Sequence, residues 1–174
     1  SSTYFSLKMA AAVMIVAVMI GTATAYGMMK LRLRTRNLMA LVVLLPITVP
    51  HIIYALASYG LLADMKLIGT LAGFVIVNVV LATSYAVITV RNGMEGFDWS
   101  LVRAASVLGA RPTRVALKIG LPLLASSLLA AALFTFLVAF DEVVVAQFIS
   151  SPFANPLSKR MWDGILFRWD PAIS

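Results

Sequence analysis

Few residues of this chain could do chemistry, and four of them lie in or beside long apolar stretches: His51, Asn78, Asp141 and Glu142. The adjacent carboxylates are the most distinctive, because two neighbouring acids attract cations. Polar groups at such depth normally face a bundle interior or a water-filled pathway. We therefore predict that these four side chains line a pathway. The acidic pair has a second interpretation, as a solvated helix end or a pair satisfied by Thr, Ser or a partner's basic residue.

His51 is the single histidine, and the chain has no cysteine. This composition excludes a thiolate metal site, an iron–sulfur cluster and a disulfide framework, and it leaves His51 without a second histidine to pair with on a metal. We expect no bound metal. A hydrogen-bonded position in a helix core remains the alternative to a pathway role for this side chain.

The segment 91–121 is too polar to span a membrane and too patterned for an irregular loop. Asp98 or Ser100 can cap a short helix there. The residues that would form its apolar face are spaced as on one side of a helix, and Gly109 follows as a left-handed cap. They are Leu101, Ala104, Ala105 and Leu108. Pro112 suits the first turn of a second short helix. A basic hairpin of this kind fits acidic lipid and a protein partner equally well.

Four helical spans must position these residues, at about 5–30, 37–62, 67–91 and 119–143. The chain is 61% hydrophobic and 12% charged, and its charge-free runs exceed the roughly 20 residues that a helix needs to cross a bilayer. These runs are apolar on every side, whereas membrane strands alternate apolar and polar residues. The prediction is an all-α membrane protein, with an external segment at 150–170 that includes the possible interface anchors Trp162 and Trp169.

The net charge of +7 comes from residues between the spans. Basic residues crowd the first and third connections, so the positive-inside rule places these two in the cytoplasm and both chain ends outside. This distribution argues against nucleic acid as a partner. The second span contains Pro46 and Pro50, which should kink or break it. In lipid such a break persists where it faces protein or a cavity, and so it marks either a pathway wall or a packing kink.

One motif in the basic segment is similar to a known family. It consists of Arg103-Ala104-Ala105, three residues, Gly109, nine residues, Ile119, one residue and Leu121-Pro122. This pattern resembles the EAA loop of inner-membrane permease subunits of binding-protein-dependent ABC importers. Phe140-Asp141-Glu142 resembles the fifth span of the spermidine/putrescine branch. The resemblance implies a MetI-like type I helical bundle of usually six spans, of which this chain would hold the second to fifth.

By that resemblance, residues 91–121 couple the permease to a motor subunit. The coupling residues are Leu101, Arg103, Ala104, Ala105, Leu108, Gly109, Arg111 and Pro112. One departure is Arg103, which stands where the family has the Glu of its motif. This puts in doubt the salt bridge expected from that position.

The family further implies a bacterial inner-membrane location and an importer for polyamines or related cations. The expected partners are a cytoplasmic ATP-binding subunit, a second permease subunit, a periplasmic binding protein and membrane lipid. No phosphate-binding G-x-x-x-x-G-K-[ST] loop occurs in the chain. We therefore expect no enzyme and no cofactor here, with ATP and Mg²⁺ bound by the partner. Another cargo (an opine, an amino acid, iron or another small solute) and a channel or scaffold remain as alternatives.

Overall fold

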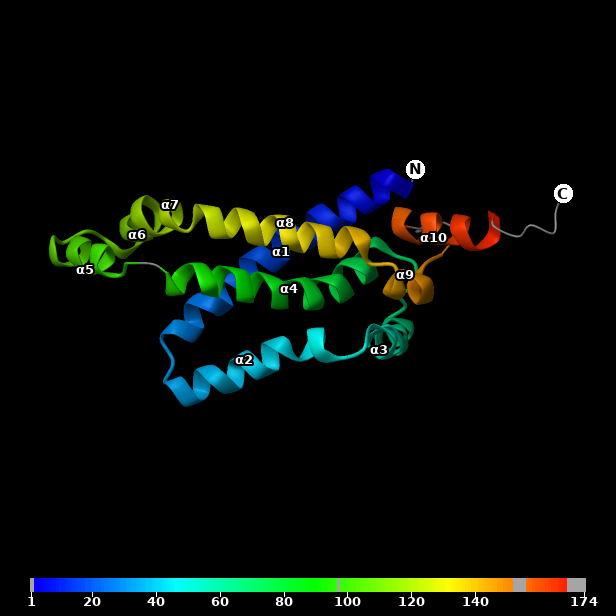
Figure 1. Ribbon diagram of the computed structural model, residues 1–174, viewed down its shortest axis with the longest axis horizontal. Coiled ribbons are helices and arrows are strands. Elements are labelled where there is room, and N and C mark those ends of the chain that lie inside the picture. Colours follow the sequence, from blue (N-terminus) through cyan, green and yellow to red (C-terminus); the bar gives the residue numbers. More distant parts are fainter. Residues whose placement is uncertain (1, 97, 152–155, 169–174) are drawn as a thin grey trace.

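The computed structural model describes residues 2–96, 98–151 and 156–168, which form helices and no strand (Figure 1). The helices are α1 Ser2–Met29, α2 Leu33–Thr48, α3 His51–Asp64, α4 Leu71–Glu95, α5 Ser100–Val107, α6 Pro112–Val115, the π-helix η1 Ala116–Gly120, α7 Leu121–Leu123, α8 Ala125–Asp141, α9 Val144–Ile149 and α10 Leu157–Arg168. The prediction of an all-helical protein is confirmed for these residues.

Three long helices, α1, α4 and α8, pack against one another and form the core (Figure 1). Small residues allow the close approach of α1 and α4: a Cβ atom added at Gly21 would lie 2.5 Å from the Cβ atom of Ala86. Near the other end of the same pair, the rings of Phe5 and Phe74 meet edge to face with centroids 5.5 Å apart. Close packing of this kind is how helices associate where lipid supplies no hydrophobic driving force.

The second predicted span is divided into α2 and α3, which meet at a bend of 93°. Pro50 causes the break, because a proline forces the residue before it out of the helical region, and Val49 is extended with ψ 132°. Pro46, by contrast, lies inside α2 and does not end it. The predicted break is therefore present, one turn later than the first proline, and it turns α3 across the end of the bundle.

The last predicted span is also interrupted. Pro122 has no N–H with which to bond the carbonyl of Lys118, and the chain before it forms the π-helix η1 instead of a regular α-helix. A bend of 67° at Leu124 then separates this segment from α8. The predicted span over 119–143 therefore corresponds to a bent pair of helical segments, of which Ala125–Asp141 is the regular α-helix.

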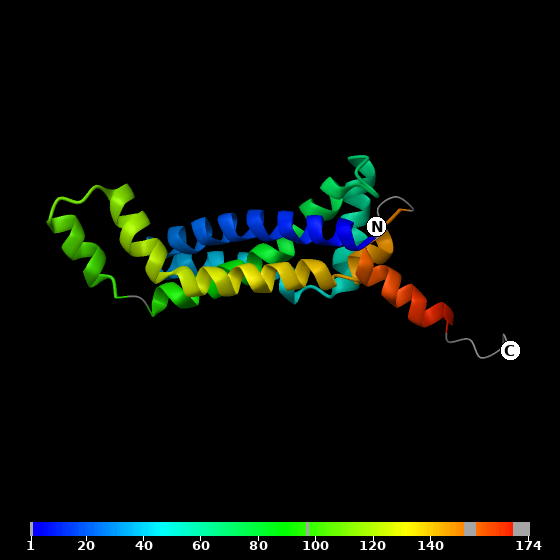
Figure 2. The ribbon, with the colours of Figure 1, turned by 90° about the horizontal axis from the view of Figure 1, so that it is seen from above.

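Among the described residues, two helices, α1 and α4, are long and apolar enough to cross a membrane alone, and up to four spans result if each bent pair counts as one. Figures 1 and 2 show the α1–α2 connection and α5–α7 at one end of the bundle, and α3, α9 and α10 at the other. Both basic connections therefore lie at the same end, as the charge pattern predicts for the cytoplasmic side.

Candidate functional site

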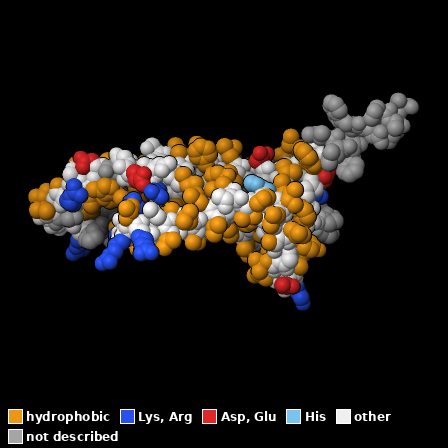
Figure 3. All heavy atoms as spheres, turned by 60° about the horizontal axis from the view of Figure 1, so that its bottom comes forward, with side chains coloured by type: hydrophobic (Ala, Val, Ile, Leu, Met, Phe, Trp, Pro, Cys, Tyr) orange, Lys and Arg blue, Asp and Glu red, His pale blue; other side chains and the backbone are white. Residues whose placement is uncertain are grey.

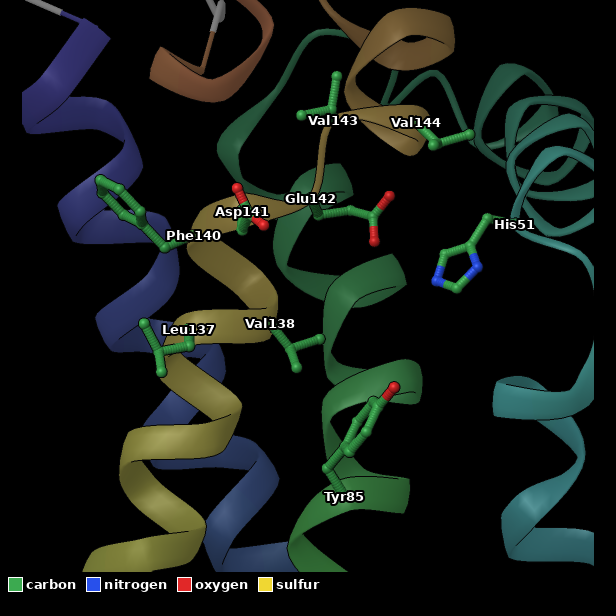
Figure 4. Close-up of a pocket in the computed structure, with 9 residues that line it drawn as sticks. All are labelled: His51, Tyr85, Leu137, Val138, Phe140, Asp141, Glu142, Val143 and Val144. Atoms are coloured by element: carbon green, nitrogen blue, oxygen red, sulfur yellow. The ribbon is translucent and has the colours of Figure 1, made fainter.

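A pocket of about 710 Å³ opens at the end of the bundle opposite the basic connections (Figure 4). Its polar lining consists of His51, Tyr85, Asp141 and Glu142. The apolar lining comes from the end of α8 and the start of α9: Leu137, Val138, Phe140, Val143 and Val144. Three of the four residues predicted to line a pathway therefore lie together, although they are up to 91 positions apart in the chain.

The two carboxylates of this pocket have different surroundings. Asp141 is the last residue of α8 and is exposed. Glu142 is only 8% exposed, and its Oε1 atom accepts a hydrogen bond from the backbone N–H of Val145, 3.1 Å away. This bond caps the first turn of α9, in the manner of an N-terminal acidic residue. Glu142 is thus satisfied by a backbone group, whereas Asp141 lies exposed at the end of a helix.

His51 begins α3 directly after the Pro50 break and is exposed. Figure 4 shows its ring and the carboxylate of Glu142 pointing toward each other across the pocket. The alternative of a hydrogen-bonded core position does not match this exposed side chain, since the bend at Pro50 carries the ring out to the pocket. The break in the second span is therefore what brings this imidazole to the acids.

Tyr85 is a pocket residue that the sequence reasoning missed. It lies midway along α4, and its hydroxyl points toward the space beneath Glu142 (Figure 4). An aromatic hydroxyl in the middle of an apolar span was the available signal, because such groups need a polar partner. With Tyr85 the pocket acquires a polar floor between α4 and α8.

Asn78 does not line this pocket. It is 2% exposed, and its Nδ2 atom donates to the backbone carbonyl of Phe74 at 2.8 Å. Its Oδ1 atom is buried and has no hydrogen-bond partner. The side chain faces the helix bundle, about two turns of α4 away from Tyr85, and takes no part in the cluster of acids.

At the basic end, α5 forms the first half of the predicted helix–turn–helix. The backbone N–H of Ser100 donates to Oδ1 of Asp98 at 2.9 Å, which confirms a cap at this position. Hydrogen bonds from the Ser100 side chain and backbone lower the pKa of Asp98, so the capping carboxylate stays ionised. The indole Nε1 of Trp99 donates to the carbonyl of Met94 at 3.2 Å and ties the start of α5 to the end of α4.

Gly109 ends the hairpin's first helix with φ +78°, as predicted from its place in the sequence. Pro112 then begins α6, also as predicted. The predicted apolar face of α5 is open to solvent: Leu101 is 47% exposed and Leu108 is 86% exposed. Arg103, Ala104 and Arg111 are exposed as well, and Ala105 is half-buried. Except for Ala105, these residues therefore lie on a surface that the described part of the chain does not cover.

The sequence was compared with models of known protein families. Residues 17–173 match the model of the binding-protein-dependent transport system inner membrane component. The chain belongs to this family. The family is one of inner-membrane components, and the long apolar helices α1 and α4 agree with a location in that membrane.

Within this inner-membrane component family, the chain is 27% identical over 181 residues to the putrescine transport system permease protein PotI of Escherichia coli K12, with 100% of this chain and 64% of PotI covered. It is 27% identical over 172 residues to the spermidine/putrescine transport system permease protein PotC of the same strain, covering 97% and 64%. PotC of Haemophilus influenzae is 28% identical over 137 residues, covering 77% and 52%. The chain thus spans 64% of the length of the two Escherichia coli relatives.

Proposed function

We propose that this chain is a permease subunit of an ATP-driven importer for putrescine, spermidine or related organic cations. The observation that carries this proposal is the pocket of Asp141 and Glu142 at the end opposite the basic connections. Support for the cargo class comes from PotI and PotC, whose names record putrescine and spermidine transport. A linear amine with ammonium groups is attracted by carboxylates, most strongly where the surroundings exclude water.

The pocket's geometry suits an elongated cation. Asp141 is exposed and has no ion pair with another described residue, so its charge is available to an ammonium group. The apolar side chains of Leu137, Val138 and Val144 line the same space and can contact methylene groups. Tyr85 offers a hydroxyl that can accept a hydrogen bond from an amine.

Coupling to a motor is the second part of the proposal. The exposed α5, with Leu101 and Leu108 on its open face and Gly109 at its turn, would dock onto a cytoplasmic ATP-binding subunit that holds ATP and Mg²⁺. Arg103 takes the position of the family's Glu, so an acidic residue of the ATPase would be its natural partner. A second permease subunit and a periplasmic binding protein complete the proposed assembly.

Uptake of labelled putrescine and spermidine tests the cargo. Cells expressing the assembled system with Asp141→Asn should accumulate polyamine at least about tenfold more slowly than wild type. A tenfold change corresponds to the loss of about 1.4 kcal/mol of attraction between the carboxylate and an ammonium group. Asp163→Asn is the matched control, because it removes one external carboxylate that is paired with Lys159 at 3.5 Å. No polyamine uptake in the wild-type system, despite normal assembly and ATPase activity, would reject the cargo.

A further inference from the structure

Four cations lie in the short connection between α1 and α2 and in the first turn of α2: Lys30, Arg32, Arg34 and Arg36. Lys30, Arg32 and Arg34 are exposed, and none of the four forms an ion pair with a described residue. The first 63 residues of the chain contain no Asp or Glu. This concentration of positive charge therefore has no counterpart nearby in the sequence and calls for an anion from outside the chain.

These cations lie at the membrane boundary. The apolar helix α1 ends at Met29 and α2 begins at Leu33, so all four are within about one helical turn of a helix end at this connection. The ammonium group of Lys30 lies 4.4 Å from the centre of the Tyr26 ring, an arrangement typical of the interface between bilayer and water. Positions beside the ends of membrane-spanning helices correspond to the region of the lipid headgroups.

An uncovered apolar stripe continues from the cations along α2, which has no buried residue. Arg34, Leu38 and Val42 are spaced at i, i+4 and i+8 and share one face. Leu38 is 58% exposed and Val42 66% exposed. A positive group at the head of an exposed apolar stripe matches a phospholipid, which has a phosphate at one end and acyl chains below it.

The placement of α5–α7 argues against a motor subunit as the occupant. Figures 1 and 2 show α5–α7 projecting beyond the level at which α1 passes into α2. A soluble subunit resting on α5 would be held further out along the long axis, whereas the four cations stay level with the ends of the apolar helices. Figure 3 likewise shows Lys and Arg side chains gathered at this end of the molecule, next to hydrophobic surface.

We propose that Lys30, Arg32 and Arg34 bind the phosphate of an acidic phospholipid of the cytoplasmic leaflet, and that its acyl chains lie along Leu38 and Val42. Charge complementarity selects the acidic lipid, since the cytoplasmic leaflet attracts Lys and Arg placed near its surface. The proposal does not depend on the cargo or on the ATPase contact. It assigns this connection a ligand of its own.

Lipid retention on the purified, assembled complex tests the proposal. The complex is exchanged into nanodiscs of phosphatidylcholine that contain phosphatidylglycerol, and the lipids that remain after transfer to detergent are counted by native mass spectrometry. We expect the wild type to retain phosphatidylglycerol in preference to phosphatidylcholine. Arg32→Gln with Arg34→Gln should reduce that preference at least about tenfold, since each cation near the surface corresponds to roughly fivefold.

The control is Arg114→Gln with Lys118→Gln, which removes the same charge from exposed sites at the same end and should leave the preference intact. The single Arg34→Gln variant, at an exposed site, serves if the double variant fails to assemble, and it should lower the preference about fivefold. An unchanged preference in the Arg32 and Arg34 variants overturns the proposal. Loss of a partner subunit from these variants with lipid retention unchanged also overturns it, and assigns the surface to that subunit.

Discussion

Glu142 caps α9 through a 3.1 Å hydrogen bond from the backbone N–H of Val145, while its neighbour Asp141 stays exposed at the end of α8. The carbonyl of Glu142 also accepts a hydrogen bond from the hydroxyl of Ser158 in α10, at 3.4 Å. Glu142 therefore stabilises the start of α9, whereas Asp141 presents its charge to the pocket. Substitutions at the two positions can test these two roles separately.

Replacing Glu142 by Ala should lower the free energy of unfolding by about 1 kcal/mol, because the cap of α9 is lost. Glu142→Gln keeps an oxygen that can accept from Val145, and it should leave the thermal midpoint close to that of the wild type. Thermal unfolding of the purified complex in detergent measures both. Equal destabilisation by the two changes would show that the charge, and not the hydrogen bond, stabilises this turn.

The close approach of α1 and α4 gives a second prediction. Gly21→Ala places a Cβ atom 2.5 Å from that of Ala86 and 3.2 Å from backbone atoms of α4, so the helices must separate. We expect a destabilisation of about 1–3 kcal/mol. Gly27→Ala on the same helix is the control, since nothing lies within 4 Å of its added Cβ. A wild-type unfolding midpoint for Gly21→Ala would contradict the close packing of this helix pair.

Gly109 and Gly120 allow a test of the turn after α5. An added Cβ meets nothing within 4 Å at Gly109, but its φ of +78° is strained for any other residue, by roughly 1–2 kcal/mol. Gly109→Val should therefore reorient α5 and reduce substrate-stimulated ATPase activity of the assembled complex. Gly120→Ala, with only one contact at 3.9 Å, should retain it. Full activity in Gly109→Val would remove α5 from the coupling mechanism.

The cap at Asp98 predicts a pH dependence with a defined sign. Its pKa is lowered by the hydrogen bonds from Ser100, so its stabilisation of α5 is present above the ordinary Asp pKa and is lost as the pH falls through the lowered one. Between pH 6 and 8 the carboxylate stays ionised, so the protection of the Ser100 amide against exchange should not change with pH. Asp98→Ala should speed that exchange, as hydrogen-exchange mass spectrometry can measure; an unaltered rate would mean that the carboxylate does not hold the turn.

Local sequence chemistry predicted the features that depend on one or two residues. Gly109, Pro112 and the break near Pro50 are all as expected, because glycine and proline restrict the backbone whatever surrounds them. The third span was predicted to begin four residues early, at 67–91 instead of Leu71–Glu95. Thr70 is the reason: its hydroxyl accepts from the N–H of Gly73 at 3.1 Å and fixes the first turn.

The site itself could be predicted only in part. The sequence marked His51, Asp141 and Glu142, but nothing in their spacing shows that they meet, since α3 reaches the end of α8 only through the 93° bend. Asn78 had the same signal, a polar residue within an apolar span, yet it faces the core and bonds to its own helix. Which face of a span lines a pathway is decided by tertiary packing. Residues 152–155 and 169–170 of the predicted external segment, Trp169 among them, lie outside the described residues.

The proposed docking of α5 onto a separate ATP-binding subunit can be tested by crosslinking. Because the chain has no native cysteine, Leu108→Cys creates a single thiol at a site that is 86% exposed. Leu33→Cys, at a site 64% exposed on the same end of the bundle, is the matched control. In the assembled complex, both variants are labelled with a benzophenone maleimide, whose maleimide forms a thioether with the introduced thiol. Irradiation then inserts the benzophenone into a C–H bond of the protein that lies beside it, and the products are identified by mass spectrometry. We predict that the Leu108→Cys variant crosslinks to the ATP-binding subunit and the Leu33→Cys variant does not; equal crosslinking from both, or none from Leu108→Cys, would contradict the account.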